Sequence, residues 1–266
     1  MKIAITGKGG VGKTTLAGTL ARIFAADGFA VLAIDADPDM NLASAIGIKN
    51  PPAPLTEHKK LIEERAGTDT GGIFKLNPKV DDIACRFGVT EHGVSMLTMG
   101  TIDKGGSGCM CPASSLLRAL LRHVLLREQS IVILDMEAGI EHLGRGTASG
   151  VDLMIVVVEP GTRSIETAAR IQKLSKKIGI GRLAAVINRA SERDIDAISA
   201  KLDRLGIPVI GAIPYDDKLI QADINEQAPF DAGGDAVLAI ERIKDAITRI
   251  HNLYATAYLQ PFPRIL

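Results

Sequence analysis

The stretch GKGGVGKTT, residues 7–15, constrains the fold of this chain more than any other feature. It follows a short apolar run, KIAIT at 2–6, and it opens a helical pattern over residues 14–27. The stretch fits the P-loop pattern G-x-x-x-x-G-K-[ST], in which a glycine-rich turn joins a strand to a helix N-terminus. Such a turn presents backbone N–H groups and the positive end of the helix dipole to an anion. The sequence therefore predicts a β-loop-α unit that binds nucleotide phosphates.

The positions of this loop have separate chemical tasks. The side chain of Lys13 would reach the β- and γ-phosphates, and the hydroxyl of Thr14 would be a ligand of Mg²⁺. Backbone N–H groups supply the other phosphate contacts, because glycine lets the chain wrap closely around an anion. These contacts are expected from Gly9, Gly10, Val11, Gly12 and Thr15.

Further apolar runs alternate with helical patterns along the chain. They lie at 29–35, 94–100, 130–135, 153–159, 183–188 and 208–213. Continuous rather than alternating apolar runs indicate strands buried on both faces. The alternation predicts an α/β fold, a single-domain P-loop NTPase fold over residues 1–266 with a mostly parallel sheet flanked by helices on both faces. The polar, Pro- and Gly-rich stretch 49–72 is interpreted as a surface insertion within this domain.

An acidic residue ends one of these apolar runs. In ILDMEAG, residues 133–139, Asp135 closes the strand and a glycine follows, so Asp135 is the candidate Walker B aspartate that holds Mg²⁺ through water. His142 lies in the segment that follows. We interpret it as a switch or surface residue, because no second histidine lies at the spacing of a metal site.

A second lysine, Lys8, lies inside the P-loop. The motif K-G-G-x-x-G-K-[ST] resembles the deviant Walker A motif of the MinD/ParA/nitrogenase-iron-protein group of dimerising ATPases. The resemblance implies that Lys8 reaches across a homodimer to the nucleotide of the partner. It also implies slow ATP hydrolysis, with Lys8, Lys13 and Asp37 as the catalytic residues.

The same resemblance assigns the stretch DADPDMN, residues 35–41, to switch I at the carboxyl end of the second strand, where ligands of open α/β sheets gather. By position, Asp37 matches the aspartate that orients or activates the attacking water. Asp35 and Asp39 either hold Mg²⁺ through water or are solvated loop carboxylates, and both alternatives stay open. Asn41 is a candidate contact on the γ-phosphate side. The expected Mg²⁺ site comprises Thr14, Asp37 and Asp135.

The expected base is adenine. Guanine-specific P-loop proteins usually carry N-K-x-D, which is absent from this sequence. Instead, VINRA places Asn188 and Arg189 at a strand end, which resembles the Asn-Arg adenine contact of MinD-like proteins. The stretch IPYDD at 213–217, with Pro214 and Tyr215, is similar to the second base-proximal loop of that family. Together these features favour ATP and ADP over guanine nucleotides.

Two of the three cysteines, Cys109 and Cys111, lie in GGSGCMCPASS at 105–115. Pro112 begins a helical pattern, so Cys111 lies near a helix N-terminus, which favours the metal-binding thiolate. In an extended chain residues i and i+2 are about 6.6 Å apart at Cα, the long end of the disulfide range, and their side chains project from the same side. The pair therefore suits two ligands of a soft metal ion.

Two thiolates supply half of a tetrahedral site. Cys85 would leave one donor missing, whereas two chains related by a two-fold axis supply four thiolates around one ion. Lys8 independently indicates a dimer. The alternative is that the pair consists of two small buried hydrophobic residues.

The motifs GKGGVGKTTLAG, DADPD, GGSGCMCP and DMEAGIEHLGRGT together resemble the CooC-type nickel-insertion accessory ATPases of carbon monoxide dehydrogenase, from residue 1 to about the IPYD loop. The resemblance implies an ATPase that carries Ni²⁺ at a dimer-shared C-x-C site and delivers it to the nickel–iron–sulfur cluster of its client. Zn²⁺ could occupy the same site, since thiolates bind both ions. A related ATPase serves acetyl-CoA synthase, and the sequence does not separate the two clients.

Composition argues against several partners. Lys+Arg and Asp+Glu are both 31, Trp is absent and aromatic residues make up 3% of the chain, so neither nucleic acid nor an anionic membrane surface is expected as a partner. No apolar run approaches transmembrane length. The first residues enter a strand without a signal-peptide pattern, and we expect a cytoplasmic protein.

Three rival functions exist within the same group. A [4Fe–4S] electron donor like the nitrogenase iron protein has cysteines far apart in sequence, whereas here they are almost adjacent. A MinD-type membrane partitioner needs a basic amphipathic C-terminal helix, but HNLYATAYLQPFPRIL contains two prolines and a single arginine. A ParA-type DNA-partitioning ATPase is disfavoured by the balanced charge.

Overall fold

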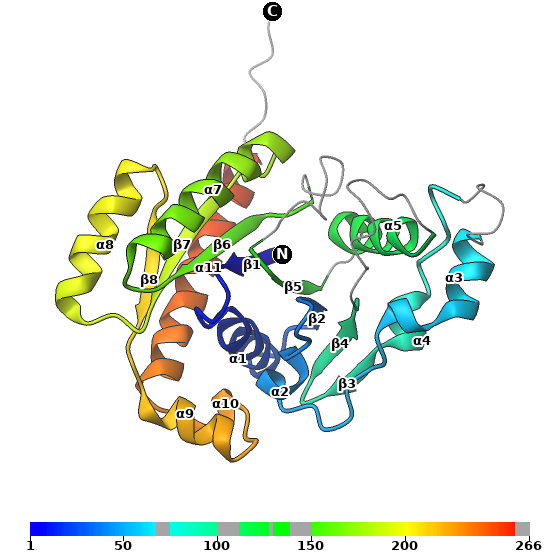
Figure 1. The fold of residues 1–266 in the computed structure, drawn as a ribbon, viewed down its shortest axis with the longest axis horizontal. Coiled ribbons are helices and arrows are strands. Elements are labelled where there is room, and N and C mark those ends of the chain that lie inside the picture. Colours follow the sequence, from blue (N-terminus) through cyan, green and yellow to red (C-terminus); the bar gives the residue numbers. More distant parts are fainter. Residues whose placement is uncertain (68–74, 101–111, 128–129, 139–149, 259–266) are drawn as a thin grey trace, which may run out of the picture.

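One β-sheet organises the computed structural model, which describes residues 1–67, 75–100, 112–127, 130–138 and 150–258. The strands in these ranges run in the order β3-β4-β2-β5-β1-β6-β7-β8 (Figure 1). All neighbours are parallel except β3 and β4. The strands are β1 (Lys2–Gly7), β2 (Val31–Ala36), β3 (Val89–Glu91), β4 (Val94–Thr98), β5 (Ile131–Met136), β6 (Leu153–Val158), β7 (Leu183–Asn188) and β8 (Val209–Ile213).

Helices cover both faces of this sheet (Figure 1). One layer contains α1 (Lys13–Ala26), α2 (Leu42–Ile46), α9 (Asp217–Ile224), α10 (Pro229–Ala232) and α11 (Asp235–Tyr258). The other contains the 3-10 turn η1 (Leu55–Glu57), α3 (Lys59–Ala66), α4 (Ile83–Phe87), α5 (Pro112–Arg127), α7 (Thr162–Ile178) and α8 (Glu192–Arg204). Ile3 and Ile5 of β1 pack into the first layer and Ala4 into the second, because successive strand residues point to opposite faces. The predicted fold class is confirmed.

The antiparallel edge strand β3 is not among the predicted strands. It is only three residues long, and a two-residue turn connects it to β4. Both turn residues, His92 and Gly93, have positive φ (52° and 76°), the conformation of a type I′ hairpin turn. The turn fits the twist of the paired strands, but His-Gly is a weaker sequence signal for it than Asn-Gly.

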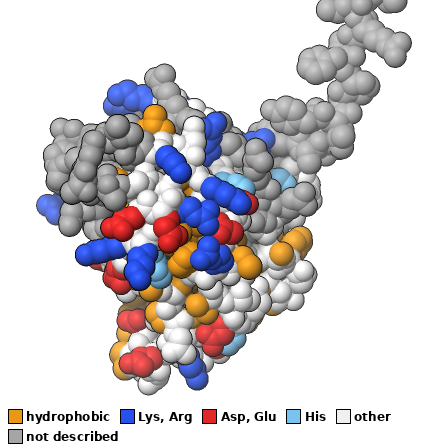
Figure 2. Space-filling view, turned by 90° about the vertical axis from the view of Figure 1, so that its right-hand side faces the viewer, with side chains coloured by type: hydrophobic (Ala, Val, Ile, Leu, Met, Phe, Trp, Pro, Cys, Tyr) orange, Lys and Arg blue, Asp and Glu red, His pale blue; other side chains and the backbone are white. Residues whose placement is uncertain are grey.

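The stretch interpreted as a surface insertion contributes to the core in its described part, residues 49–67. Leu55 of η1 and Leu61 and Ala66 of α3 are buried among the residues that pack beneath α5. The neighbouring face carries mixed charge. Figure 2 shows basic and acidic side chains interspersed there, and Asp82 pairs with Arg65 (2.7 Å) and Arg86 (3.0 Å). None of the described helices is both long and apolar enough to span a bilayer.

The parallel strands bring their carboxyl ends to one edge of the sheet, where ligands of α/β folds bind. Strand β5 lies between β1 and β2, and Asp135 of β5 is the register partner of Asp35 of β2. Helices α1 and α5 begin at the same edge, because each follows a parallel strand and returns along the sheet to the next one. The P-loop, the DADPDMN loop and the start of α5 are therefore neighbours by topology.

Candidate functional site

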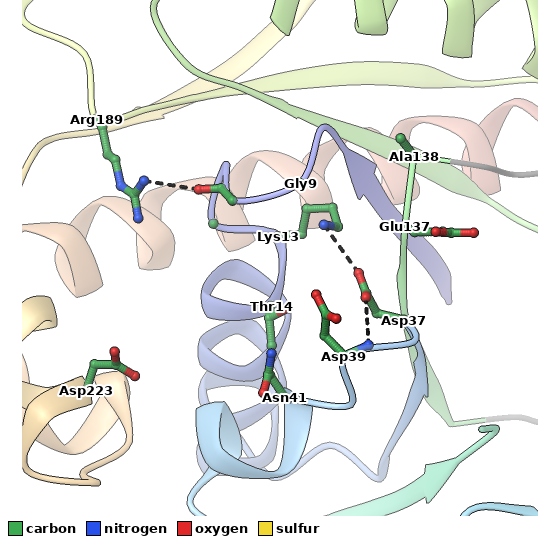
Figure 3. A pocket seen from close by; sticks show the side chains of 12 residues that line it. Gly9, Lys13, Thr14, Asp37, Asp39, Asn41, Glu137, Ala138, Arg189 and Asp223 are labelled. Carbon is green, nitrogen blue, oxygen red and sulfur yellow. Dashed lines mark hydrogen bonds and ion pairs between the residues drawn. The ribbon is translucent and has the colours of Figure 1, made fainter. Parts of the chain in front are cut away.

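A hollow of about 540 Å³ opens at this edge, above the P-loop (Figure 3). It is of a size that small-molecule sites commonly have. The sequence predicts eight of the residues that surround it as site residues, candidate contacts or open alternatives, and Arg189 as a base contact. The lining consists of Gly9, Gly10, Gly12, Lys13, Thr14, Asp37, Asp39, Asn41, Glu137, Ala138, Arg189 and Asp223.

The P-loop leaves the N-terminus of α1 open toward this hollow. Gly12 precedes α1 in a left-handed conformation (φ 90°), it provides no side-chain cap, and the first turn of α1 contains no acidic residue. The backbone N–H groups of that turn and the helix dipole are therefore available to an anion. Gly7 is needed at the start of the loop, because a Cβ there would collide with the carbonyl of Val157 on β6.

The end of β7 clamps the P-loop from the side. The Asn188 side-chain amide donates to the carbonyl of Val11 (2.8 Å), and the guanidinium of Arg189 donates to the carbonyl of Gly10 (3.0 Å). The side-chain oxygen Oδ1 of Asn188 accepts from the Arg189 backbone N–H (3.0 Å), and Asn188 is buried. These two residues, predicted as base contacts, thus also hold the loop that wraps the phosphates.

A second hollow, of about 750 Å³, continues from the first on the side of α9. It combines an apolar wall, which includes Pro214, Tyr215, Leu219 and Ile220, with the polar residues Asn188 and Gln227. The structure therefore brings the predicted base-proximal residues together. Four residues line both hollows: Thr14, Asn41, Arg189 and Asp223.

Lys13 and Asp37 form an ion pair at the base of the first hollow. The Lys13 ammonium lies 3.3 Å from a carboxylate oxygen of Asp37, and the two side chains are 7% and 11% exposed. The P-loop lysine therefore has an anionic partner without any nucleotide. A phosphate group that enters the hollow must compete with Asp37 for this lysine.

Asp35 fixes the loop that contains Asp37. Its carboxylate is fully buried and accepts from the backbone N–H groups of Asp37 (3.2 Å) and Leu42 (3.0 Å). Burial raises the pKa of Asp35 to about 6, although these two backbone hydrogen bonds lower it in part. Asp35 is thus not a solvated loop carboxylate, whereas Asp39 is exposed and faces the hollow.

Asp135 is a buried carboxylate, and neither of its oxygens has a hydrogen-bond partner within the described ranges. Burial raises the pKa of Asp135 to about 7, the nearby Thr14 hydroxyl and Lys13 offset this only in part, and the negative charge of Asp35 adds to the rise. A buried carboxylate without a partner, beside a hydroxyl, is a donor set that suits a hard divalent cation. These residues fit Mg²⁺.

Lys8 faces a different part of the molecule. Its ammonium lies 3.4 Å from Glu159, and the Lys8 side chain is 41% exposed. The strand register explains the pair, because β1 and β6 are parallel with Gly7 opposite Val157, and the two charged residues follow these strand ends. Lys8 lines a shallow hollow with Arg170 of α7 and is absent from the lining of the phosphate hollow.

The predicted metal ligands Cys109 and Cys111 and the histidine His142 lie outside the described residues. Within the described ranges, His, Cys, Asp and Glu form no group of three or more that could hold a metal ion, and Cys85 is exposed on α4. The ends that flank residues 101–111 lie at the carboxyl edge of the sheet. The backbone N–H of Met99 donates to the carbonyl of Asp35 (2.8 Å), and α5 begins at Pro112.

Sequence reasoning missed three residues of the first hollow: Glu137, Ala138 and Asp223. Glu137 and Ala138 follow Asp135 in the chain, so their place at the strand end was a usable signal. Asp223 lies on α9, which packs beside α10 and reaches the hollow only through its tertiary packing. No local sequence pattern marks it.

Comparisons with known proteins agree with this geometry. The protein-family model of the CobQ/CobB/MinD/ParA nucleotide binding domain matches residues 2–230 of the sequence. The chain therefore belongs to this family of nucleotide-binding domains and is a P-loop ATPase, which confirms the class predicted from the deviant Walker A motif.

Two individual relatives show which members of this family the chain is similar to. The carbon monoxide dehydrogenase accessory protein CooC of Rhodospirillum rubrum is 48% identical over 233 residues, which are 84% of this chain and 87% of that protein. An uncharacterised ATP-binding protein of Methanocaldococcus jannaschii is 45% identical over 256 residues, covering 95% and 99%. The resemblance to CooC-type proteins is confirmed by this similarity.

Solved structures share the fold. A chain of the MinC:MinD cell division protein complex of Aquifex aeolicus aligns with a TM-score of 0.68 at 22% identity, covering 100% of this chain and 98% of that one. A ParA family ATPase from Chlorobium tepidum aligns with a TM-score of 0.68 at 18% identity, covering 92% and 97%. At these sequence identities, the structural similarity shows a shared fold alone.

Replacing Lys13 and Asp37 one at a time should separate nucleotide binding from ATP hydrolysis. Lys13→Ala should lower the affinity for ADP at least roughly 100-fold, because a charge-assisted phosphate contact is lost. In the absence of Mg²⁺, Asp37→Asn should leave that affinity unchanged or raise it, since the competitor for Lys13 is neutralised. It should nevertheless lower ATP turnover at least roughly 100-fold, the scale of a lost general base. Calorimetric titration and phosphate release measure the two quantities, and a proportional loss of both in Asp37→Asn would contradict this division of roles.

Asp135→Asn should stabilise the nucleotide-free, metal-free protein at alkaline pH. The pKa of Asp135 is raised from 3.8 to about 7, so between these values the folded state holds a proton that the unfolded chain releases, and this group's contribution to stability falls as pH rises through that window. We expect the variant to melt roughly 4 °C higher than the parent protein at pH 8. Removing the buried charge should raise the free energy of unfolding by on the order of 2 kcal/mol. The difference should shrink by pH 5. Melting curves in the presence of a chelator measure it, and a difference that does not vary with pH would contradict the argument.

Proposed function

We propose that this protein is an ATP-driven nickel carrier that serves carbon monoxide dehydrogenase. The observation that carries the proposal is the 48% identity, over 84% of the chain, to a carbon monoxide dehydrogenase accessory protein. The C-x-C pair, Cys109 and Cys111, supports nickel as the cargo, because two cis thiolates suit a soft ion. Acetyl-CoA synthase is the alternative client, since both enzymes need nickel supplied to a metal cluster.

The proposed nucleotide binding rests on the first hollow. The N-terminal turn of α1 would hold the phosphates, Lys13 would bind their terminal oxygens, and Thr14, Asp37 and Asp135 would hold Mg²⁺. When bound, Mg²⁺ neutralises charge that develops on the phosphate oxygens. Once a phosphate group pairs with Lys13, the Asp37 carboxylate no longer binds the lysine and would orient the attacking water beside Mg²⁺.

The proposed dimer rests on Lys8. Its side chain is half-exposed and directed to the α7 side, away from the hollow that holds its own P-loop lysine. A lysine placed in this way serves a nucleotide on a second chain more readily than its own. In the single chain, Glu159 forms an ion pair with the Lys8 ammonium, and dimerisation would break this pair.

The proposed link between hydrolysis and metal release rests on the place of residues 101–111 in the chain, between β4 and α5. This segment follows β4, whose end is hydrogen-bonded to the carbonyl of Asp35, and it precedes α5. Asp35 also holds the amide of Asp37. A shift of the Asp37 loop on hydrolysis would therefore act on the strand end that leads to the cysteines, which offers a route for ATP hydrolysis to release the ion.

Lys8→Ala should weaken ATP-driven dimerisation and lower turnover at least roughly tenfold, because a charge that stabilises the partner's transferring phosphate is lost. Its affinity for ADP as a monomer should stay unchanged. Glu159→Gln is the matched control, since it breaks the same ion pair and keeps the lysine. It should dimerise at least as well as the parent protein. Size analysis with a non-hydrolysable ATP analogue tests this, and equal behaviour of both variants would overturn the role of Lys8 in trans.

Metal titration tests the shared nickel site. We expect one Ni²⁺ or Zn²⁺ per dimer, proton release on binding and weaker binding at acid pH, because the thiols must ionise. Cys109→Ala and Cys111→Ala should each lower the affinity at least roughly 100-fold. Cys85→Ala is the matched control and should retain the affinity, because Cys85 is exposed on α4. One ion per monomer, or binding that survives loss of both residues of the pair, would rule out the shared site.

A further inference from the structure

The pairing between β1 and β5 ends at Asp135, the aspartate proposed to hold Mg²⁺. The last register pair of the two strands is Ile5 of β1 opposite Asp135 of β5. One residue further along β1, the side-chain hydroxyl of Thr6 donates a hydrogen bond to the backbone carbonyl of Glu137 (2.8 Å). A side chain of β1 therefore holds the chain that leaves β5, just past the point where the strands stop pairing.

The side chain of Thr6 lies on the face of the sheet opposite to the P-loop helix. Ile5 packs into the layer of α1 and Ala4 into the layer of α5 and α7, because successive strand residues alternate between the two faces. Thr6 shares its face with Ala4 and is fully buried. Asp135, the register partner of Ile5, lies near Thr14 at the start of α1. Thr6 thus contacts neither phosphate nor Mg²⁺ and acts on the site only through the backbone that follows β5.

The two buried aspartates at this edge of the sheet are fixed in different ways. Two backbone N–H groups hold the carboxylate of Asp35, whereas the oxygens of Asp135 have no hydrogen-bond partner within the described ranges. The direction of the Asp135 side chain therefore depends on where the backbone of β5 places it. That backbone pairs with β2 as far as Met136, and on the β1 side the Thr6 hydroxyl holds the next residue.

We propose that Thr6 is a positioning residue for the Mg²⁺ site, and that its bond to the carbonyl of Glu137 fixes the place from which Asp135 meets the ion. The inference deepens the proposed function and rests on its Mg²⁺ site. Glu137 and Ala138 line the first hollow, so the same bond fixes the part of the hollow's wall that follows β5 (Figure 3). The role needs a hydroxyl donor, which valine lacks although its shape is similar.

The test is a calorimetric titration of Mg²⁺ into the ADP complex of the full-length protein, with ATP turnover measured beside it. Thr6→Val should weaken Mg²⁺ binding at least roughly tenfold, the scale of a lost group that orients a metal ligand. Its affinity for ADP in the presence of a chelator should stay within about twofold of the parent value, because the P-loop N–H groups and Lys13 are unchanged. Turnover at limiting Mg²⁺ should fall with the Mg²⁺ affinity.

Two further variants at the same position separate the hydroxyl from the packing of the side chain. Thr6→Ser keeps the donor and should retain Mg²⁺ affinity within about threefold of the parent protein, since the hydrogen bond can still form. Thr6→Ala removes both the donor and the methyl group. It should weaken Mg²⁺ binding like Thr6→Val, so the result does not depend on how valine packs.

Thr19→Val provides the control for the exchange itself. Thr19 lies on α1 and is fully buried like Thr6, but its hydroxyl has no hydrogen-bond partner in the part of the chain that the structure describes. The same substitution there breaks no hydrogen bond. The Mg²⁺ affinity of this variant should stay within about twofold of the parent value.

Four results would overturn the assignment. They are parent-like Mg²⁺ affinity in Thr6→Val, a Thr6→Ser variant as weak as Thr6→Val, a Thr19→Val variant as weak as Thr6→Val, and an equal loss of ADP affinity with and without Mg²⁺. The last result would show general damage to the P-loop strand. If the parent protein itself binds no ADP, or binds no Mg²⁺ in the ADP complex, the proposed nucleotide site fails as well, so the two failures are distinguishable.

Discussion

The ion pair between Lys13 and Asp37 is the interaction on which the rest of the site depends. Both side chains are almost buried, so neither charge can lose its partner without a substitute. When nucleotide binds, a phosphate group would replace Asp37 as the partner of Lys13. Mg²⁺ or water would replace Lys13 as the partner of Asp37. Binding therefore exchanges partners within the site, and the loop that contains Asp37 is the part that responds.

That loop is held at both ends. Asp35 binds the backbone N–H groups of Asp37 and Leu42, so a fully buried carboxylate fixes the entrance and exit of residues 36–41. Beyond it, Arg22 donates to the carbonyl of Ile46 at the end of α2 (2.7 Å) and pairs with Asp231 of α10 (2.7 Å). The loop can thus rearrange between fixed ends, while α2 stays attached to the helices that border the base-side hollow.

Much of this was predictable from sequence, for physical reasons that differ between elements. The central strands are continuous apolar runs because both of their faces are covered, and the P-loop is recognisable because phosphate binding requires glycine and lysine at fixed spacing. The Lys8–Glu159 pair was not predictable, because it depends on the register of β1 against β6. Asp223 reaches the first hollow through the packing of α9, and the strand β3 is too short to show a period. The structural role of Asn188 against Val11 likewise appears only when β7 is placed beside the P-loop.

The most direct measurement is the activation of nickel-free carbon monoxide dehydrogenase by the nickel-loaded protein under anaerobic conditions, followed as recovered CO oxidation. ATP, a non-hydrolysable ATP analogue and the Asp37→Asn variant should be compared at equal nickel content. We expect rapid activation with ATP and the parent protein, and activation no faster than that by free Ni²⁺ with the analogue or the variant. Equal activation in all three cases would contradict the claim that exchange at the Lys13–Asp37 pair couples ATP hydrolysis to metal release.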